Sequence, residues 1–496
     1  MDESTATKAR VSSPTMPAVP APPPERPPAA QPAEGARATF ALLREALRGS
    51  RRDLTKQPIG QAIFLLAVPM IAEMIMESVF AVVDIFWVSK LGPDAVAAVG
   101  LTESMLVIIY ALGMGLSMGA AAVVARRIGE GNPEGASRAA VQAIVIGLLL
   151  AAAVGSLGAW LAPHLLLVMG ASPAVIAMGG GFTRTMLGGS VTVMLLFLIN
   201  AAFRGAGDAA ISMRTLWLAN GINIVLGPFL IFGWGPFPRM GVMGAAVATT
   251  IGRGTGVLFQ LRALARGRGR LGVRRAHLRI DRAVMRSILR ISRSGIVQSL
   301  IGTASWVGLV RILSTFGSTA LAGYTIAVRV VLFALLPSWG LANAAATLVG
   351  QNLGAGHPER AEVAVWRAAR YNTVLLTLVG VLFVAGAHVI VGGFSPEAGV
   401  VAVGARALRI VGLGFPFYAV GMVMTQAFNG AGDTRTPTLI NLFCFWLWEI
   451  PLAYVLAKPI GLGPTGVFIA IAVAFSTIAV VAGVLFHRGG WKRVKV

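Results

Sequence analysis

Apolar stretches long enough to cross a lipid bilayer alternate with short polar segments along most of the chain. A transmembrane helix needs about 20 apolar residues, and we count twelve such stretches. Some are longer than a bilayer requires, so we expect tilted or kinked helices. The pattern predicts an all-α integral membrane protein with spans at 61–88, 95–125, 137–161, 181–203, 209–233, 242–264, 294–316, 320–350, 361–386, 406–428, 435–457 and 464–486.

Three short motifs recur at a constant offset of 225 residues, which indicates an internal duplication. The matching pairs are FRGAGD with FNGAGD (Phe203–Asp208, Phe428–Asp433), IGEGNPE with LGAGHPE (Ile128–Glu134, Leu353–Glu359), and Leu91-Gly92 with Phe316-Gly317. Both halves begin on the same side of the membrane, so the repeat is parallel, an arrangement found in transporters.

The duplication predicts four parts of the chain. We expect a six-helix N-terminal bundle at 58–268, and an arginine-rich linker with a six-helix C-terminal bundle at 269–487. The tail at 1–57 begins Pro/Ala-rich, and we expect disorder over 1–35. Phe40–Lys56 is expected to be a basic amphipathic helix on an anionic membrane surface or, alternatively, a solvated linker. A second basic tail covers 488–496.

Composition excludes the soluble globular classes. The chain is 56% hydrophobic and 12% charged, with a mean hydropathy of +0.76. A net charge of +22 would suggest nucleic acid in a soluble protein, but here the basic residues gather in particular loops, so we expect no nucleic-acid partner. The one cysteine, Cys444, lies in an apolar stretch and permits no intramolecular disulfide.

The basic residues predict the orientation. Eleven arginines lie between Arg262 and Arg293, and the loops on the same side hold most of the others. The opposite loops offer little beyond Lys90, Arg239 and Lys458. Because basic loops stay in the cytoplasm, we expect both termini there, in the inner (plasma) membrane of a bacterium.

The repeated loops have a structural interpretation as helix ends. Gly129 or Gly131 can take the left-handed conformation that ends a helix, and Asn132 can cap the next one. His357 occupies the equivalent position in the second half. The aspartates of the GAGD motifs are expected to cap the helices that follow them, Asp208 and Asp433.

Three acidic residues lie within the first span, Glu73, Glu77 and Asp84. At about 100° per residue they share one narrow helix face, and they are spaced by about 6 Å and about 10 Å along the axis. We call these three residues the acidic ladder. Inserting a charged side chain at the centre of a membrane helix costs roughly 2.5–3.5 kcal/mol, so we expect each acid to have a partner or a function.

Carboxylates in a poorly hydrated cavity can exchange a proton near neutral pH. We therefore expect Asp84, with Glu77 and Glu73, to couple transport to an ion. Carriage of H⁺ is favoured, and Na⁺ bound at Asp84 is the alternative. Each acid can instead neutralise an arginine or hydrogen-bond between helices. Glu103 in the second span lies near its outer end and is expected to be solvated.

The second half lacks this ladder, because Gln298, Gly302 and Leu309 stand at the equivalent positions. Glu449 is the deep acid of that half, and pairing with Arg329 would explain it.

Two further groups can line a cavity. Asn200, Asn220 and Asn223 either line a polar path or bond between helices. The aromatic residues Tyr418, Trp446 and Trp448 either stack on a flat cation or pack among apolar neighbours.

No metal-ligand spacing, nucleophile motif or nucleotide-binding loop occurs in the sequence. We expect no cofactor, no metal site and no enzyme activity. Without an ATPase domain, uphill transport would have to use an ion gradient.

The paired GAGD loops, the run VGQNLGAGHPE (Val349–Glu359) and the segment VDIFWVSKLG (Val83–Gly92) resemble the multidrug and toxic compound extrusion (MATE) family. The resemblance covers about residues 58–487. It implies a two-lobed, twelve-helix fold with a central cavity, and export of organic cations or other amphiphiles against H⁺ or Na⁺. The family's ion-coupling aspartate of the first span falls on Asp84.

Two departures from the family pattern matter. The fifth span often reads NIVLDP, but here Gly227 replaces the aspartate between Asn223 and Pro228. The glutamate of span seven that is typical of the NorM branch is replaced by Gly302. The chain therefore resembles the DinF-like or an unassigned bacterial branch, and Glu77 and Glu73 are candidates to replace the lost aspartate.

We expect a monomeric antiporter that exports amphiphilic, cationic small molecules. The alternatives are a lipid-linked precursor flippase of the same superfamily and a membrane-embedded enzyme that modifies lipids. A cavity lined by acids argues against the flippase, and scattered histidines argue against the enzyme.

Overall fold

The computed structural model describes residues 32–267 and 269–496. The chain divides into two units, Met1–Leu42 and Leu43–Val496, which are considered separately. The disorder expected for 1–31 lies outside the described residues. Helix α1 (Pro32–Arg48) contradicts the expected disorder at 32–35.

The tail helix differs from its predicted range. Instead of covering Phe40–Lys56, α1 begins earlier and ends at Arg48, because Gly49 adopts a left-handed φ of 96°. Asp53 then accepts hydrogen bonds from the main chain and the hydroxyl of Thr55, which makes a turn before the first span.

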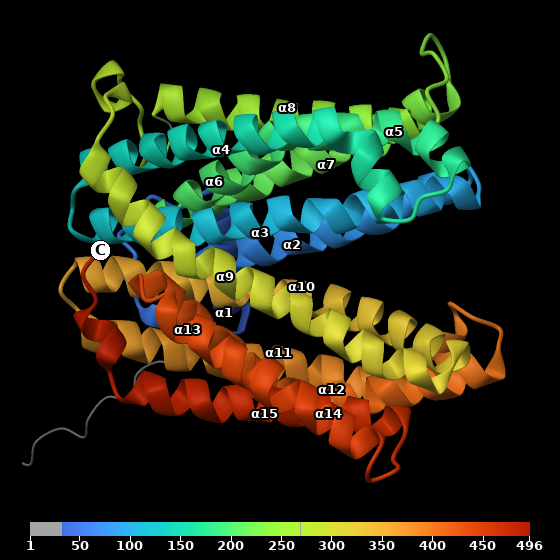
Figure 1. Cartoon of the computed structure of the whole chain (residues 1–496). Helices are drawn as coiled ribbons and strands as arrows, with labels where there is room; N and C mark the ends of the chain where they lie inside the picture. The colour runs from blue at the N-terminus through green and yellow to red at the C-terminus, as the bar shows by residue number, and fades with distance from the viewer. Residues whose placement is uncertain (1–31, 268) are drawn as a thin grey trace, which may run out of the picture. The chain divides into compact units, whose positions relative to one another are not determined.

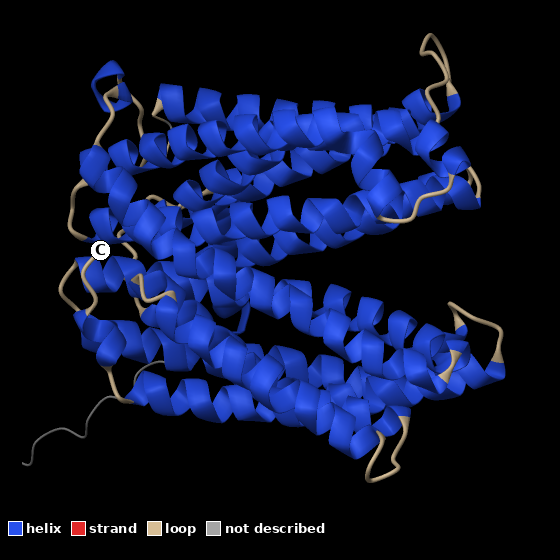
Figure 2. Ribbon diagram, viewed as in Figure 1, coloured by secondary structure: helices blue, strands red, loops and turns tan. Residues whose placement is uncertain are grey.

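The rest of the described chain is helical and contains no strand (Figure 2). The N-terminal bundle consists of α2 (Ile59–Ser89), α3 (Pro93–Gly129), α4 (Pro133–Val168), α5 (Pro173–Gly188), α6 (Ser190–Ala206), α7 (Ala209–Phe232) and α8 (Val242–Arg266). The linker holds the short 3-10 helix η1 (Arg275–Leu278).

The C-terminal bundle repeats this order. It consists of α9 (Arg282–Leu313), η2 (Ser314–Phe316), α10 (Ser318–Gly354), α11 (Pro358–Gly392), α12 (Ala398–Ala431), α13 (Arg435–Asn441), the π-helix η3 (Leu442–Glu449), α14 (Ile450–Ala457) and α15 (Pro464–His487), followed by η4 (Gly490–Arg493). Twelve helical segments are long and apolar enough to span a membrane, which confirms the predicted fold class.

Three spans depart clearly from the predicted pattern, and one of them, the eleventh, is divided into α13, η3 and α14. The fourth is two helices, α5 and α6, which meet at Gly189. The seventh begins at Arg282 instead of 294, because the side chain of Asp281 accepts hydrogen bonds from the main-chain N–H groups of Ala283 and Val284 and starts the helix early.

The helix-end predictions are confirmed in part. Asn132 caps α4 by accepting a hydrogen bond from the N–H of Gly135 at 2.7 Å, and Gly131 has the left-handed φ of 68°. His357 makes no such side-chain bond. The expected cap at Asp208 is also wrong.

Asp208 accepts a hydrogen bond from the linker instead of from α7. The donor is the main-chain N–H of Arg270, at 2.5 Å. Burial raises the pKa of the Asp208 carboxyl, and this hydrogen bond and the Arg270 charge oppose the shift. Asp433 does accept from the N–H of Thr436, at 3.1 Å.

Both bundles meet at one end, which we call the basic end. At this end α2 begins, α3 ends, and the arginine-rich linker joins α8 to α9. Figure 1 shows the bundles close together at this end and farther apart at the opposite, far end. Two helices each pack on a helix of the opposite bundle. Helix α2 of the N-terminal bundle packs on α10, and α9 of the C-terminal bundle packs on α3.

Glycines at equivalent positions allow these two crossings. A Cβ on Gly115 would lie 2.4 Å from the main-chain nitrogen of Ile296, and a Cβ on Gly340 would lie 2.8 Å from that of Ile71. Each glycine and each isoleucine stands 225 residues from its counterpart. The duplication is therefore also a structural pseudo-symmetry of the interface between the bundles.

The GAGD loops take part in the same interface. Gln351 donates to the main-chain carbonyl of Gly205 at 2.9 Å, and Arg126, at the equivalent position, donates to that of Ala431 at 3.2 Å. Each bundle thus binds the loop of the other.

Candidate functional site

The three acids of α2 each meet a different environment. Glu73 is fully buried, with 0% exposure, and its Oε1 forms an ion pair with Arg204 at 2.8 Å. Its Oε2 is buried without a hydrogen-bond partner. Glu77, one turn farther along, accepts a hydrogen bond from the side chain of Asn220 at 2.9 Å.

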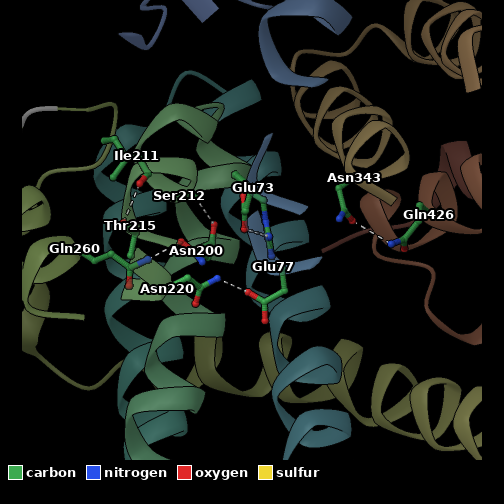
Figure 3. Close-up of polar contacts among 11 residues, drawn as sticks. Glu73, Glu77, Asn200, Ile211, Ser212, Thr215, Asn220, Gln260, Asn343 and Gln426 are labelled. Atoms are coloured by element: carbon green, nitrogen blue, oxygen red, sulfur yellow. Dashed lines mark hydrogen bonds and ion pairs between the residues drawn. The ribbon is translucent and has the colours of Figure 1, made fainter. Parts of the chain in front are cut away.

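Figure 3 shows Glu73 and Glu77 beside Asn200 and Asn220 of the same bundle. Both acids have the kind of partner that the structural alternative expects, and their part in ion coupling stays a prediction. Because a buried charge is costly unless it is paired, these contacts explain how α2 tolerates both acids.

Asp84 lies near the far end of α2 and is half-buried. None of the hydrogen bonds or ion pairs among the described residues includes its carboxylate. The charges that act on it belong to Arg253 of α8 and Glu103 of α3. Asp84 is thus the acid of the ladder that is left without a direct partner.

Sequence reasoning missed Arg253. This residue interacts with Tyr110 as well as with Glu77 and Asp84, so an arginine stands next to the acidic ladder. The available signal was that an arginine inside the sixth span is as costly as an acid and needs a partner.

The predicted asparagines form bonds between helices. Asn200 is 3% exposed and accepts a hydrogen bond from Gln260 at 2.6 Å, and Asn223 donates to Thr249 at 2.6 Å. Only Asn220 joins an acid directly. The structure therefore brings Asn220 into the acidic ladder, and it bonds Asn200 and Asn223 to α8.

Two of the aromatic candidates contact other residues of the C-terminal bundle. The ring of Tyr418 stacks on Phe475 at a centroid distance of 4.1 Å, so one of its faces is used in packing. Trp446 and Trp448 are each 41% exposed, and Trp446 donates to the carbonyl of Ile301 at 3.1 Å.

The pair expected between Glu449 and Arg329 is wrong. Arg329 is exposed and acts on Glu103 of the other bundle. Glu449 is 3% exposed at the end of the π-helix, with Tyr324 and Tyr418 near it. The pair fails because Arg329 is exposed and acts on an acid of the other bundle, whereas Glu449 is buried among residues of its own bundle.

A chain of amides in the C-terminal bundle was not foreseen. Gln426 donates to Asn343 at 3.0 Å (Figure 3). Asn429 donates to Gln426 at 2.7 Å. Asn429 stands at the position equivalent to Arg204, and Gln298 at that of Glu73. Comparing the halves residue by residue identifies Gln298 and Asn429 as neutral replacements of the ion pair, but it does not reveal the bonds to Gln426 and Asn343.

No cluster of three or more His, Cys, Asp or Glu side chains that could hold a metal ion occurs within 32–267 and 269–496. The arrangement offers carboxylates that can bind a proton or interact with a monovalent cation.

A family model described as MatE matches residues 69–229 and 295–455, one match in each bundle. The chain is 24% identical to the probable multidrug resistance protein NorM of Thermotoga maritima, over 88% of this chain and 94% of that one. It is 26% identical to the FAD transporter of Shewanella oneidensis, over 81% and 89% of the two chains.

Two solved structures are similar over 89% of this chain and 98% of theirs, each with a TM-score of 0.83 and 26% identity. One is an outward-facing multidrug resistance MATE family transporter of the MOP superfamily. The other is a MOP superfamily transporter from Pyrococcus furiosus, whose binding pocket is described as having reverse polarity.

One relative and both solved structures are named as transporters, which favours neither the lipid-linked precursor flippase nor the enzyme. The fold, the duplicated motifs and a family match that covers both bundles lead to one conclusion. This chain is a multi-pass membrane transporter that belongs to the MATE family.

Proposed function

We propose that this protein is a secondary antiporter, monomeric and located in the inner (plasma) membrane, with both termini in the cytoplasm. It exports amphiphilic, cationic small molecules in exchange for H⁺, with Na⁺ as the alternative ion. The basic end then faces the cytoplasm, because the arginine-rich linker lies there.

The half-buried carboxylate of Asp84 carries this proposal. It lies in a membrane span, beside an ordered series of acids, without a direct hydrogen-bond partner. Such a group can be neutralised by a proton from one side and recharged on the other. Glu77 with Asn220, and Glu73 with Arg204, continue the series toward the basic end.

Alternating access to the two sides of the membrane would result from a rocking motion of the two bundles about the space between them. The structure is closed at the basic end through Gln351 and Arg126, which supports an outward-facing state. Exchange of the proton for the substrate at the N-terminal bundle would then change the balance between the two states.

The test is uptake of a fluorescent organic cation into inverted membrane vesicles, driven separately by a proton gradient and by a sodium gradient. We expect uptake with the proton gradient alone, reduced to background in Asp84→Asn. The matched control is Asp94→Asn, an exposed acid in the first turn of α3, which should transport normally.

Equal uptake by Asp84→Asn and wild type would place the coupling site elsewhere, with Glu77 tested next. Uptake that requires sodium would replace H⁺ by Na⁺. The branch within the family also stays a prediction.

A second candidate substrate class follows from Arg253. Its guanidinium stands beside Glu77 and Asp84, so an amphiphile that carries an anionic group such as a phosphate would also meet a complementary charge in the site. Competition of FAD with the fluorescent cation tests this class, and an Arg253→Gln variant should lose the competition while keeping cation transport.

A further inference from the structure

The ion pair between Glu73 and Arg204 lies directly next to the closure at the basic end. The main-chain carbonyl of Arg204 accepts a hydrogen bond from Thr347 of α10 at 3.1 Å, and that of Gly205 accepts from Gln351 at 2.9 Å. Both donors belong to the other bundle. Arg204, which neutralises Glu73, therefore also accepts a hydrogen bond from the C-terminal bundle through its main-chain carbonyl.

One of the two oxygens of the Glu73 carboxylate can accept a proton without losing a hydrogen bond. Its Oε1 is bonded to Arg204, while its buried Oε2 has no hydrogen-bond partner. The charged groups that act on it are Arg204 on α6 and Glu77 on its own helix. Helices α10 and α7 also pack on α2. The one charged residue of α10 is the exposed Arg329, and that of α7 is the exposed Arg214, which donates to the main-chain carbonyl of Leu47.

We propose that Glu73 and Arg204 transmit protonation of the N-terminal bundle to the closure at the basic end. A proton on Oε2 of Glu73 removes the charge that holds the Arg204 guanidinium. The end of α6 then loses its fixed position, the bonds from Thr347 and Gln351 weaken, and the basic end opens. Arg204 acts here as a positioning residue. The inference rests on the proposed proton coupling.

The C-terminal bundle shows that this link exists on one side only. The positions equivalent to Glu73 and Arg204 hold the neutral Gln298 and Asn429. The equivalent closing bond, from Arg126 to Ala431, therefore has no charge pair behind it. Protonation therefore weakens only one of the two symmetric contacts, the one at the loop of the N-terminal bundle. The opening then depends on the protonation state of that bundle.

Spin labels across the basic end test the link without measuring transport. Ala265→Cys on α8 and Val363→Cys on α11 are exposed positions, in a background with the buried Cys444 replaced by alanine. Double electron–electron resonance on the full chain in lipid nanodiscs then reports the population of the closed and open distances. Wild type should be closed at neutral pH and should open on acidification.

The variant Glu73→Gln imitates the protonated acid and should be open at neutral pH. We expect the open-to-closed ratio to rise by on the order of tenfold, as for the loss of two hydrogen bonds of usual strength. The matched control is Asn429→Ala, which should keep the distances and the pH response of wild type.

A second variant protects the test against misfolding of the first. The double variant Thr347→Val, Gln351→Leu leaves Glu73 and Arg204 intact but removes the hydrogen bonds to the carbonyls of Arg204 and Gly205. Its open-to-closed ratio should therefore no longer depend on pH. A closed Glu73→Gln with an unchanged pH response would overturn the proposal, as would an unchanged pH response in the double variant.

The result is separable from the proposed function. If vesicles show no proton-driven uptake but Glu73→Gln opens the basic end, the link stands and the antiport proposal fails. If uptake depends on Asp84 but neither variant changes the distances, the antiport proposal stands and the link fails.

Discussion

At the residue scale, several buried polar side chains of the N-terminal bundle have a direct partner. Glu73 is buried because Arg204 lies 2.8 Å away, and Asn200 is buried because Gln260 donates to it. Burial of an ion without a partner would cost several kcal/mol. The single-residue effects we expect therefore depend on partners rather than on residue type.

The two equivalent loop residues Asn132 and His357 provide a direct comparison. Asn132→Ala removes the bond to the N–H of Gly135 and should lower the free energy of unfolding by about 1 kcal/mol. His357→Ala removes no capping bond and should change it by a few tenths of that value at most. Denaturant titration in detergent measures both, and equal losses would show that the cap at Asn132 contributes nothing of its own.

At the element scale, the crossing of long helices depends on the absence of side chains at a few contacts. Helices α2 and α10 approach closely at Gly340, where a Cβ would lie 2.8 Å from the main chain of Met70 and Ile71. The main chain cannot move aside as the end of a flexible side chain can. Packing of small residues is also the usual basis of helix association in a bilayer.

We therefore expect Gly340→Ala to separate α2 from α10 at the basic end. The variant should favour the open state in the spin-label experiment and lower the melting temperature. Gly302→Ala is the control, because no atom lies within 4 Å of its added Cβ. A closed, wild-type-like Gly340→Ala would mean that the crossing tolerates a methyl group.

At the scale of the whole molecule, two symmetric sets of hydrogen bonds hold the bundles together at one end. Gln351 makes its contact as a neutral amide, whereas Arg126 is charged and also donates to Val494 of the C-terminal tail at 3.0 Å. Hydrogen bonds from charged groups are stronger than neutral ones. The two contacts are equivalent in position but unequal in strength.

The inequality can be measured. Gln351→Ala should raise the open-to-closed ratio by roughly two- to tenfold, and Arg126→Ala by roughly ten- to a hundredfold, from usual bond strengths of about 0.5–1.5 and about 1.5–3 kcal/mol. The same spin-label pair reports both. Equal shifts would mean that the charge of Arg126 and its bond to the tail add nothing to the closure.

Much of the architecture was predictable because membrane insertion imposes a simple pattern on the sequence. The twelve spans follow from their length and apolar composition, and the duplication follows from three motifs at one offset. The boundaries were less predictable, since the early start at Arg282 depends on a local cap and the division of span four on contacts at Gly189.

The candidate site was predictable in its residues but not in their pairing. The spacing of Glu73, Glu77 and Asp84 shows that they share a helix face, because the helix period is a local property. Which acid is neutralised depends on Arg204 and Arg253, which come from other helices. The mistaken pairing of Glu449 with Arg329 has the same cause.

The sequence by itself determined the helices, their number, the internal duplication and the acids that membrane burial makes costly. These properties depend on the periods and lengths of local segments. Only the tertiary structure decided that Glu73 is paired while Asp84 is not, that glycines at equivalent positions let α2 and α9 cross, and that the GAGD loops are gripped by the opposite bundle. Those outcomes depend on which side chains the packing of distant helices brings within a few ångströms.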